Sequence, residues 1–341
     1  IYDSKPFSLS LTANTDLNEV PFAFLLTGET NKLELDGKYL IDSGNVHAQL
    51  NIDIPKAETF AFLAEDYLDA LTGNLHGTAL ITGPLDQPDL NGKLYLRDMN
   101  IQMKDSGLYF SIPDDSIAFS HNELRLDSFR LFDRGGRPMK LTGTLHTPDY
   151  SAYDYDLKVQ TEKYALMDNA GDPEAILKGL LMIGTDTRIS GNNKDTYVNA
   201  ALTIRDTTSL IYTYPSSGSE LTQTQGIIEF VDPSILADTS TLVTSGGAYD
   251  SLIALLPDFI LQSKINIEDK VKLKIIVDSE SGDYLEAAGG GKLDMGYDRT
   301  GNLNLSGTYT VVNGIYRLSF YNLVKKNFTI VPGSSITWSG N

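Results

Sequence analysis

The chain has 341 residues, contains no cysteine and carries a formal net charge of −18 at pH 7. The missing cysteines exclude disulfides, thiolate metal sites and cysteine nucleophiles, and the negative charge disfavours nucleic acid as a partner. Because no run of 18 apolar residues and no basic-then-apolar leader occurs, we expect any membrane anchor to lie outside this segment. The length suits two or three domains or one array of repeats.

Alternating polar and apolar residues predict strands along most of the chain, beginning with residues 2–11 and 20–26, and about 20 strands in all. Helical spacing of apolar residues predicts one helix near residues 56–71 and a second near residues 172–183, where Asp172 could cap and Pro173 could start the helix. A weaker third helix is expected at residues 250–256. Serine, threonine and glycine predict mobile loops at residues 216–225 and 232–249.

A diverged repeat runs through the strands: a strand ending in glycine, a loop, a strand starting near a second small residue, and a turn into another strand. Its small-residue pairs are Gly28 with Gly37, Gly83 with Gly92, Gly191 with Ala200, and Gly296 with Gly307. The turns are expected at residues 42–45, 97–100, 205–208 and 313–314. The last of these is Asn-Gly, the strongest short hairpin signal. Repeats of one unit favour an elongated stack.

The C-terminal residues resemble a known family. The motifs are Gly307-Thr-Tyr-Thr-Val-Val-Asn-Gly-Ile-Tyr316 and Lys326-Asn-Phe-Thr-Ile-Val-Pro-Gly-Ser-Ser-Ile-Thr-Trp338-Ser-Gly340, preceded by a related stretch at residues 271–293. They resemble the C-terminal domain of the TamB family, the translocation and assembly module proteins of the gram-negative envelope. The resemblance is specific over residues 258–341. In the family further strands follow, so we expect a fragment cut at both ends.

The resemblance also implies a fold, because the TamB family is similar to AsmA-like and bridge-like lipid transfer proteins. We therefore expect an all-β chain with two or three short helices, whose elongated, curled, antiparallel-rich sheet forms a U-shaped apolar trough from diverged repeats. The expected segments are residues 1–160 with the first helix, residues 161–257 with the second helix and the mobile loops, and a truncated TamB-like segment at residues 258–341. We expect one continuous trough rather than separate domains.

Strand parity predicts which side chains line this trough. The expected lining residues share one parity within their strands: Tyr39, Ile41, Leu94, Leu96, Ile101, Met103, Leu202, Ile204, Tyr309, Val311, Tyr316, Leu318 and Phe320. The residues expected on the outside alternate with them: Lys93, Tyr95, Arg97, Thr203, Arg205, Thr308 and Arg317.

No catalytic motif accompanies this pattern. The four histidines, at 47, 76, 121 and 146, lack metal-ligand spacing, and Gly289-Gly-Gly-Lys292 lacks the serine or threonine of a phosphate loop. We read these glycines as a bulge or a close backbone approach within a strand. We therefore expect no enzyme activity, no catalytic residues, no metal and no cofactor.

Two functions of different classes remain. The first is a conduit that carries phospholipid by its acyl chains between the inner and outer membranes, in the periplasm, as part of an inner-membrane-anchored protein. The second is an assembly factor whose C-terminal end docks on an Omp85-type outer-membrane barrel and helps outer-membrane proteins insert. A structural rod is a weaker third hypothesis. A conduit needs a continuous apolar lining, whereas an assembly factor needs exposed strand edges.

Overall fold

The computed structural model describes residues 8–13, 18–28, 30–104, 108–147, 151–170, 175–214, 259–278, 281–320 and 324–340. Within these ranges, eighteen strands form a single sheet, accompanied by one 3-10 helix. No helix in the described part of the chain is long and apolar enough to cross a membrane.

The elements of the N-terminal half are β1 (Ser8–Ala13), β2 (Glu19–Gly28), β3 (Asn31–Leu40), β4 (Asn45–Ile54), η1 (Ala57–Ala64), β5 (Leu68–Pro84), β6 (Asp89–Met103), β7 (Tyr109–Ser120), β8 (Glu123–Phe132) and β9 (Pro138–His146). Those of the C-terminal half are β10 (Asp154–Asp168), β11 (Leu177–Asn192), β12 (Thr196–Ile204), β13 (Ser209–Thr213), β14 (Phe259–Asp278), β15 (Asp283–Tyr297), β16 (Leu303–Phe320), β17 (Val324–Ile330) and β18 (Ser335–Ser339).

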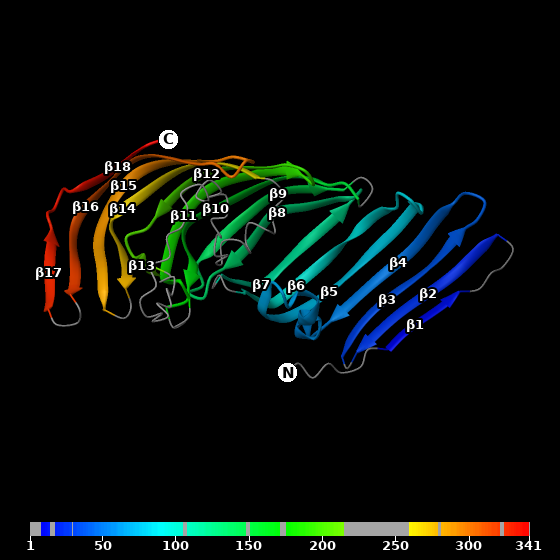
Figure 1. The fold of residues 1–341 in the computed structure, drawn as a ribbon. Coiled ribbons are helices and arrows are strands. Elements are labelled where there is room, and N and C mark those ends of the chain that lie inside the picture. The colour runs from blue at the N-terminus through cyan, green and yellow to red at the C-terminus, as the bar shows by residue number, and fades with distance from the viewer. Residues whose placement is uncertain are drawn as a thin grey trace, which may run out of the picture.

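The strands follow one another through the sheet almost in chain order. Each strand from β1 to β11 pairs antiparallel with the next, and β12 and β13 lie end to end along β11. Both then pair in parallel with β14, after which β15 and β16 continue antiparallel. At the far end, β17 and β18 cover different halves of β16. Figure 1 shows this row of strands from β1 to β17 and β18.

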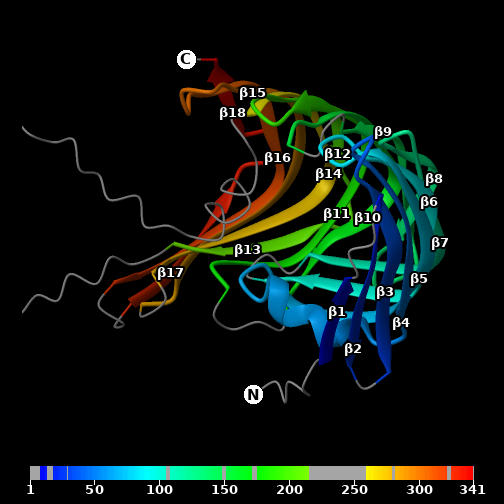
Figure 2. The same ribbon diagram turned by 90° about the vertical axis from the view of Figure 1, so that its right-hand side faces the viewer.

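The sheet is strongly curved across its strands, and Figure 2 shows a concave and a convex side. The long strands are irregular near their middles. Pairing slips at residues 162–163 of β10, at residues 268–270 of β14 and between β15 and β16. Residues 205–208 separate β12 from β13 beside the slip in β14. Such bulges bend a strand and increase its local twist, so we attribute the curvature of this half of the sheet to them.

Arg205, at the break between β12 and β13, is hydrogen-bonded to the bulges of β10 and β14. The guanidinium of Arg205 donates to the carbonyl oxygen of Glu162 in β10, with its Nε 2.9 Å away, and its Nη1 lies 3.0 Å from Oε1 of Glu268 in β14. The other oxygen of Glu268 accepts the backbone N–H of Asp206 at 2.7 Å. These hydrogen bonds lower the pKa of Glu268, the one from Asp206 contributing most. The backbone groups freed by the bulges are thereby satisfied from neighbouring strands.

Three of the four expected turns do not form hairpins. Residues 97–100 and 313–314 lie inside β6 and β16, where bulges at Asp98 and Val312 interrupt the pairing. Residues 205–208 form a break between two strands that continue in one direction. The turn at residues 42–45 does join paired strands, β3 and β4. A bulge shifts the apolar alternation by one residue, and in sequence this resembles the two arms of a hairpin.

The helix predictions also differ from the structure. The helix at residues 172–183 is wrong: β11 begins at Leu177, and its run of buried side chains, which includes Met182 and Ile183, reflects burial on both faces of a strand. The first helix is shorter than expected, because η1 ends at Ala64 and β5 begins at Leu68. The helix expected at residues 250–256 and the loops expected at 216–225 and 232–249 lie outside the described residues.

Asp133 organises the turn between β8 and β9. Its carboxylate is 1% exposed and accepts the Nε of Arg137 at 2.6 Å and the backbone N–H of Ala165 in β10 at 2.7 Å. Burial alone would raise the pKa of Asp133, but the hydrogen bonds from Ala165 and Arg137 and the charge of Arg137 outweigh it and lower the pKa. The carboxylate therefore stabilises the fold as an anion.

We expect Asp133→Ala to lower the free energy of unfolding by about 2–4 kcal/mol, because several buried donors lose their acceptor. Asp133→Asn should cost less, since one oxygen remains. Because the folded-state pKa is depressed, the contribution is present above the unfolded value of about 3.9 and is lost as the pH falls through the folded value. Urea unfolding at several pH values measures this. Exposed Asp36→Ala is the control, and equal losses in both variants would contradict the assignment.

The bulge in β16 gives a second prediction. Val311 is 6% exposed, whereas its neighbour Val312 is 45% exposed. Deleting Val312 removes the extra residue, so Val311 and Tyr316 become an even number of positions apart and keep their shared face, but β16 loses the bend that the bulge gives it. We expect this change of strand shape to cost about 1–3 kcal/mol, while Val312→Ala should cost about 0.5 kcal/mol or less. Chemical denaturation of both variants tests this, and a deletion as stable as the point variant would show that the bulge is dispensable.

Candidate functional site

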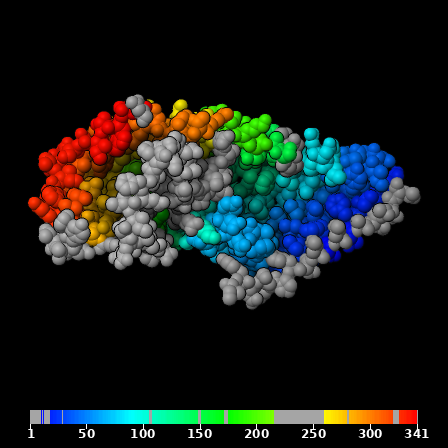
Figure 3. Space-filling model, viewed as in Figure 1, coloured from blue at the N-terminus to red at the C-terminus, as the bar shows by residue number. Residues whose placement is uncertain are grey.

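The candidate site is the concave face of the sheet, defined here as the face on which η1 packs. Ala57 of η1 is 1% exposed and belongs to one apolar cluster with Leu96, Met99, Ile112 and Phe129. Figure 2 places η1 inside the curve of the sheet, and in the space-filling view η1 stands in front of the strands (Figure 3). The side chains that share a face with Leu96 therefore point into the curve.

On β6 the bulge at Asp98 keeps the apolar side chains on this face. Leu94 and Leu96 precede the bulge, and Met99 follows it in the same cluster as Leu96. Alternation from Met99 then places Ile101 and Met103 on the concave face as well. The residues expected outside, Lys93, Tyr95 and Arg97, are exposed on the convex face.

A second apolar cluster continues this lining toward the C-terminus. It contains Met139, Tyr164 and Ile183, and Leu202 packs against it. Leu131 and Leu141 pack against both clusters, so the two are continuous.

From Ile183 the pairing carries the concave face across four more strands. Ile183 pairs with Ile204, Ile204 with Ile267, Ile267 with Gly291, and Gly291 with Tyr309. Directly paired residues share a face of a sheet, so Ile204 and Tyr309 lie on the same side as the second cluster.

The remaining expected lining residues divide into three groups. Val311 precedes the bulge of β16, and Tyr316 and Leu318 follow it on the same face as Tyr309. Tyr39 pairs with buried Val46 on the apolar face of β3 and β4. Two residues do not extend the lining: Ile41 is 51% exposed in the turn after β3, and the side chain of Phe320 lies outside the described residues.

Glycines of β15 let Tyr309 lie close against the sheet. A Cβ built on Gly289 would stand 2.8 Å from the hydroxyl oxygen of Tyr309, and one on Gly291 would stand 2.1 Å from the carbonyl oxygen of Thr308. The expected close backbone approach in this Gly-Gly-Gly segment is therefore present. Burial raises the pKa of the Tyr309 phenol, which is consistent with an apolar surrounding.

The convex face has the opposite character. Ion pairs cross neighbouring strands there, between Lys38 and Glu19 at 3.1 Å and between Lys158 and Asp186 at 3.2 Å. Arg188 and Asp156 form another pair, which lowers the pKa of Asp156 mainly through the hydrogen bond. Each of these side chains is about half exposed, so the pairs add little stability. They make this face polar and accessible to solvent.

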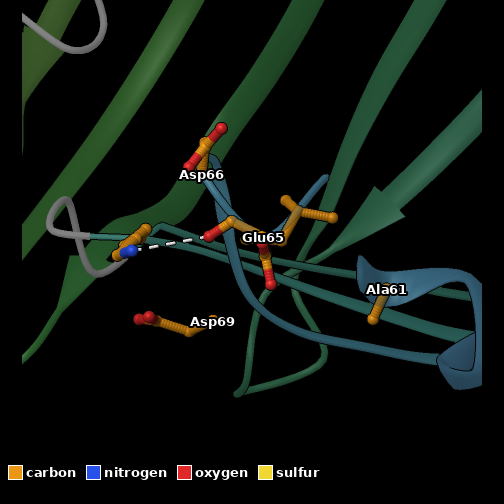
Figure 4. Close-up of a pocket in the computed structure, with 6 residues that line it drawn as sticks. Ala61, Glu65, Asp66 and Asp69 are labelled. Atoms are coloured by element: carbon orange, nitrogen blue, oxygen red, sulfur yellow. Dashed lines mark hydrogen bonds between the residues drawn. The ribbon is translucent and has the colours of Figure 1, made fainter. Parts of the chain in front are cut away.

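A small hollow opens where the chain leaves η1 for β5. It has a volume of about 440 Å³, and Figure 4 shows the carboxylates of Glu65, Asp66 and Asp69 around it beyond Ala61. Nζ of Lys104 lies 3.4 Å from the carbonyl oxygen of Glu65. Across the described residues, no group of three histidine, cysteine or acidic side chains is arranged to hold a metal ion. The rim at this point is thus acidic and polar.

Two features of the concave face escaped the sequence analysis. The bulges that hold its lining in phase were interpreted as turns. The apolar side chains of Phe62, Leu63 and Tyr67, on and just after η1, are 44%, 72% and 49% exposed, which the helix expected near residues 56–71 did not reveal. Only one sequence signal could have suggested this exposure: few apolar residues with helical spacing precede Leu68.

Comparison with known proteins identifies a family. A family model described as the TamB C-terminal domain matches residues 130–341, more than half of the chain and well beyond the C-terminal motifs. No curated protein and no solved structure matches the chain. The family match, which spans the end of β8 and all strands from β9 to β18, shows that the chain belongs to the TamB family.

Proposed function

We propose that the chain is a periplasmic segment of a TamB-like envelope protein and conducts phospholipid between the inner and outer membranes. In this proposal the repeats build a U-shaped trough, and acyl chains travel along its concave face. The observation that carries the proposal is the continuous apolar lining from η1 and β6 to β16, with cross-strand ion pairs confined to the other face. The membrane anchor would belong to another part of the protein.

The physical chemistry of the lining suits acyl chains. Each CH₂ group removed from water gains about 0.8 kcal/mol. Because β12 and β13 share one position in the sheet and β17 and β18 share another, strands spaced ~4.8 Å apart extend over about 70 Å. Such a length would bind several lipids in series, so that each moves between similar sites without leaving the apolar surface. Headgroups would remain in water at the open side. The proposal includes no catalytic step, metal or cofactor.

A single charge on the lining should block transport. We expect Leu94→Asp to reduce phospholipid transfer between vesicles at least about tenfold, because a carboxylate on the apolar path must be desolvated by each passing chain. Leu94 is partly exposed on the concave face, so this variant should fold. Leu96 is unsuitable because it is 7% exposed within the first apolar cluster.

The matched control is Tyr95→Asp, the same charge one residue along β6 on the convex face, where Tyr95 is 39% exposed. It should change the transfer rate by less than about twofold, since exposed positions tolerate charge. Fluorescent phospholipid transfer is measured for both variants, with thermal unfolding to verify the fold. Equal transfer by wild type and Leu94→Asp would refute the path.

A second candidate function rests on the strand edge at β17 and β18. In the described residues both strands pair with β16 alone, and Phe328, Val331 and Ile336 are 43%, 71% and 53% exposed. Open edges recruit further strands. We propose that this end docks by strand addition, directly or through further strands, on an Omp85-type outer-membrane barrel, as an assembly factor would.

The pairing of β18 identifies the backbone group to remove. Gly340 donates its N–H to Leu305, so by alternation the N–H of Thr337 points toward the open edge. Thr337→Pro deletes that donor without removing a backbone hydrogen bond to β16; the hydroxyl contact with Thr308 at 3.0 Å is lost as well, but it is lost equally in Thr337→Val. We expect it to weaken binding to the periplasmic domains of the barrel at least about tenfold, measured by calorimetry. Thr337→Val keeps the N–H and should bind normally, and unchanged binding by Thr337→Pro would place docking elsewhere.

A further inference from the structure

The convex face contains a hollow of about 790 Å³ over β8 to β11, on the side opposite the apolar lining. Its walls come from the strands at the bulge of β10: Arg130, Arg137, Pro138, Lys140, Gln160, Thr161, Glu162, Lys163, Thr185 and Asp186. Four of these side chains are cationic and two are anionic. This excess of positive charge is unusual for a chain with a net charge of −18.

The pairing register brings two of the cations face to face. Arg130 of β8 pairs directly with Lys140 of β9, and like charges at such a position destabilise a sheet. Lys140 pairs in turn with neutral Gln160. Among the described residues no carboxylate forms an ion pair with Arg130 or Lys140, whereas Lys38, Lys158 and Arg188 on this face each have one.

The two acidic residues of the hollow do not neutralise this pair. Asp186 is engaged by Nζ of Lys158 at 3.2 Å and by Nε2 of Gln160 at 2.8 Å, and these hydrogen bonds lower its pKa. Glu162 lies at the bulge, and within the described part of the chain its carboxylate forms no ion pair with Arg130 or Lys140. Arg137 is held by Asp133. Lys163 is close enough to Glu268 to help lower the pKa of that carboxyl, so Arg130 and Lys140 are the two cations left to face the hollow together.

We propose that this hollow binds a phosphate-bearing anion, between Arg130 and Lys140 and within reach of Lys163. An arginine binds two phosphate oxygens at once and lysines add point charges, so one phosphate group relieves the repulsion of the pair. Pro138 and the hydrocarbon stems of the basic side chains add apolar wall beside it. The phosphate can belong to a phospholipid headgroup or be free in solution, and either source uses the same contacts.

The site lies on the opposite face from the proposed lipid path, so the two proposals can fail separately. The test measures binding of inorganic phosphate and of monomeric dihexanoyl phosphatidylglycerol to the whole chain, by calorimetry at low salt. We expect binding of at least one probe, at least about tenfold weaker in the double variant Arg130→Gln with Lys140→Gln. The matched control, Lys93→Gln with Arg97→Gln, removes two cations from the same face. Its affinity for the probe should stay within about twofold of the wild type.

The outcomes separate the sources. Binding of phosphate and the lipid alike assigns a free anion, and binding of the lipid alone assigns a headgroup; each supports the site. Binding only to vesicles that contain phosphatidylglycerol would show diffuse surface attraction and overturn it, as would no binding at all or an equal loss in the control variant.

Thermal unfolding gives a readout that a purely structural role would not produce. Without phosphate, Lys140→Gln should unfold at a higher temperature than wild type, because the like-charge pair is gone. Added phosphate should raise the unfolding temperature of the wild type but not that of the variant. A variant that is less stable in both conditions would mean that Lys140 serves the fold rather than an anion.

Discussion

The bulges near the middle of the long strands are the constraint on which the rest of the structure depends. A strand places successive side chains on opposite faces, and a sheet this wide must bend or split. Here β6 and β16 bend at a bulge and afterwards resume their alternation with the same face inward, as Leu96 and Met99 show in β6 and Val311 and Tyr316 in β16. The guanidinium of Arg205 joins the break between β12 and β13 to the bulges of β10 and β14, so these irregularities are coupled.

The separation of the two faces follows from that phase control. If Val312 took part in regular alternation instead of forming a bulge, Arg317 would point into the curve and Leu318 out of it. The apolar clusters of both halves meet at Leu131 and Leu141 and form one lining. The ion pairs of β2, β3, β10 and β11 remain in water on the convex face. This separation is what a path for acyl chains needs, and it leaves the outer surface available for the phosphate site proposed between Arg130 and Lys140.

Much of this organisation could be predicted from the sequence, because period-two alternation is a local signal. The predominance of strands, the face of Leu94 and Tyr309, and the family at the C-terminus all rest on residues within a few positions of one another. The bulges could not be recognised, because a phase shift at Asn313-Gly314 is compatible with either a hairpin or a continuous strand, and long-range pairing decides between them. The helix predicted over residues 172–183 was wrong for a related reason: a short apolar run fits either a helix or a strand that is buried on both faces. The hollow around Lys140 depends on the register of four strands, which no local pattern encodes.

The most direct test of the central claim is a photo-crosslinking scan of adjacent residues on three strands. A photoreactive amino acid would replace Leu94 or Lys93, Leu202 or Thr203, and Tyr309 or Thr308 in the chain expressed in a gram-negative cell, and mass spectrometry would identify the adducts. The account predicts phospholipid adducts at Leu94, Leu202 and Tyr309 and few at their neighbours, since only the former side chains face the apolar lining. Adducts of equal yield at both members of each pair, or phospholipid at none of the six, would contradict it.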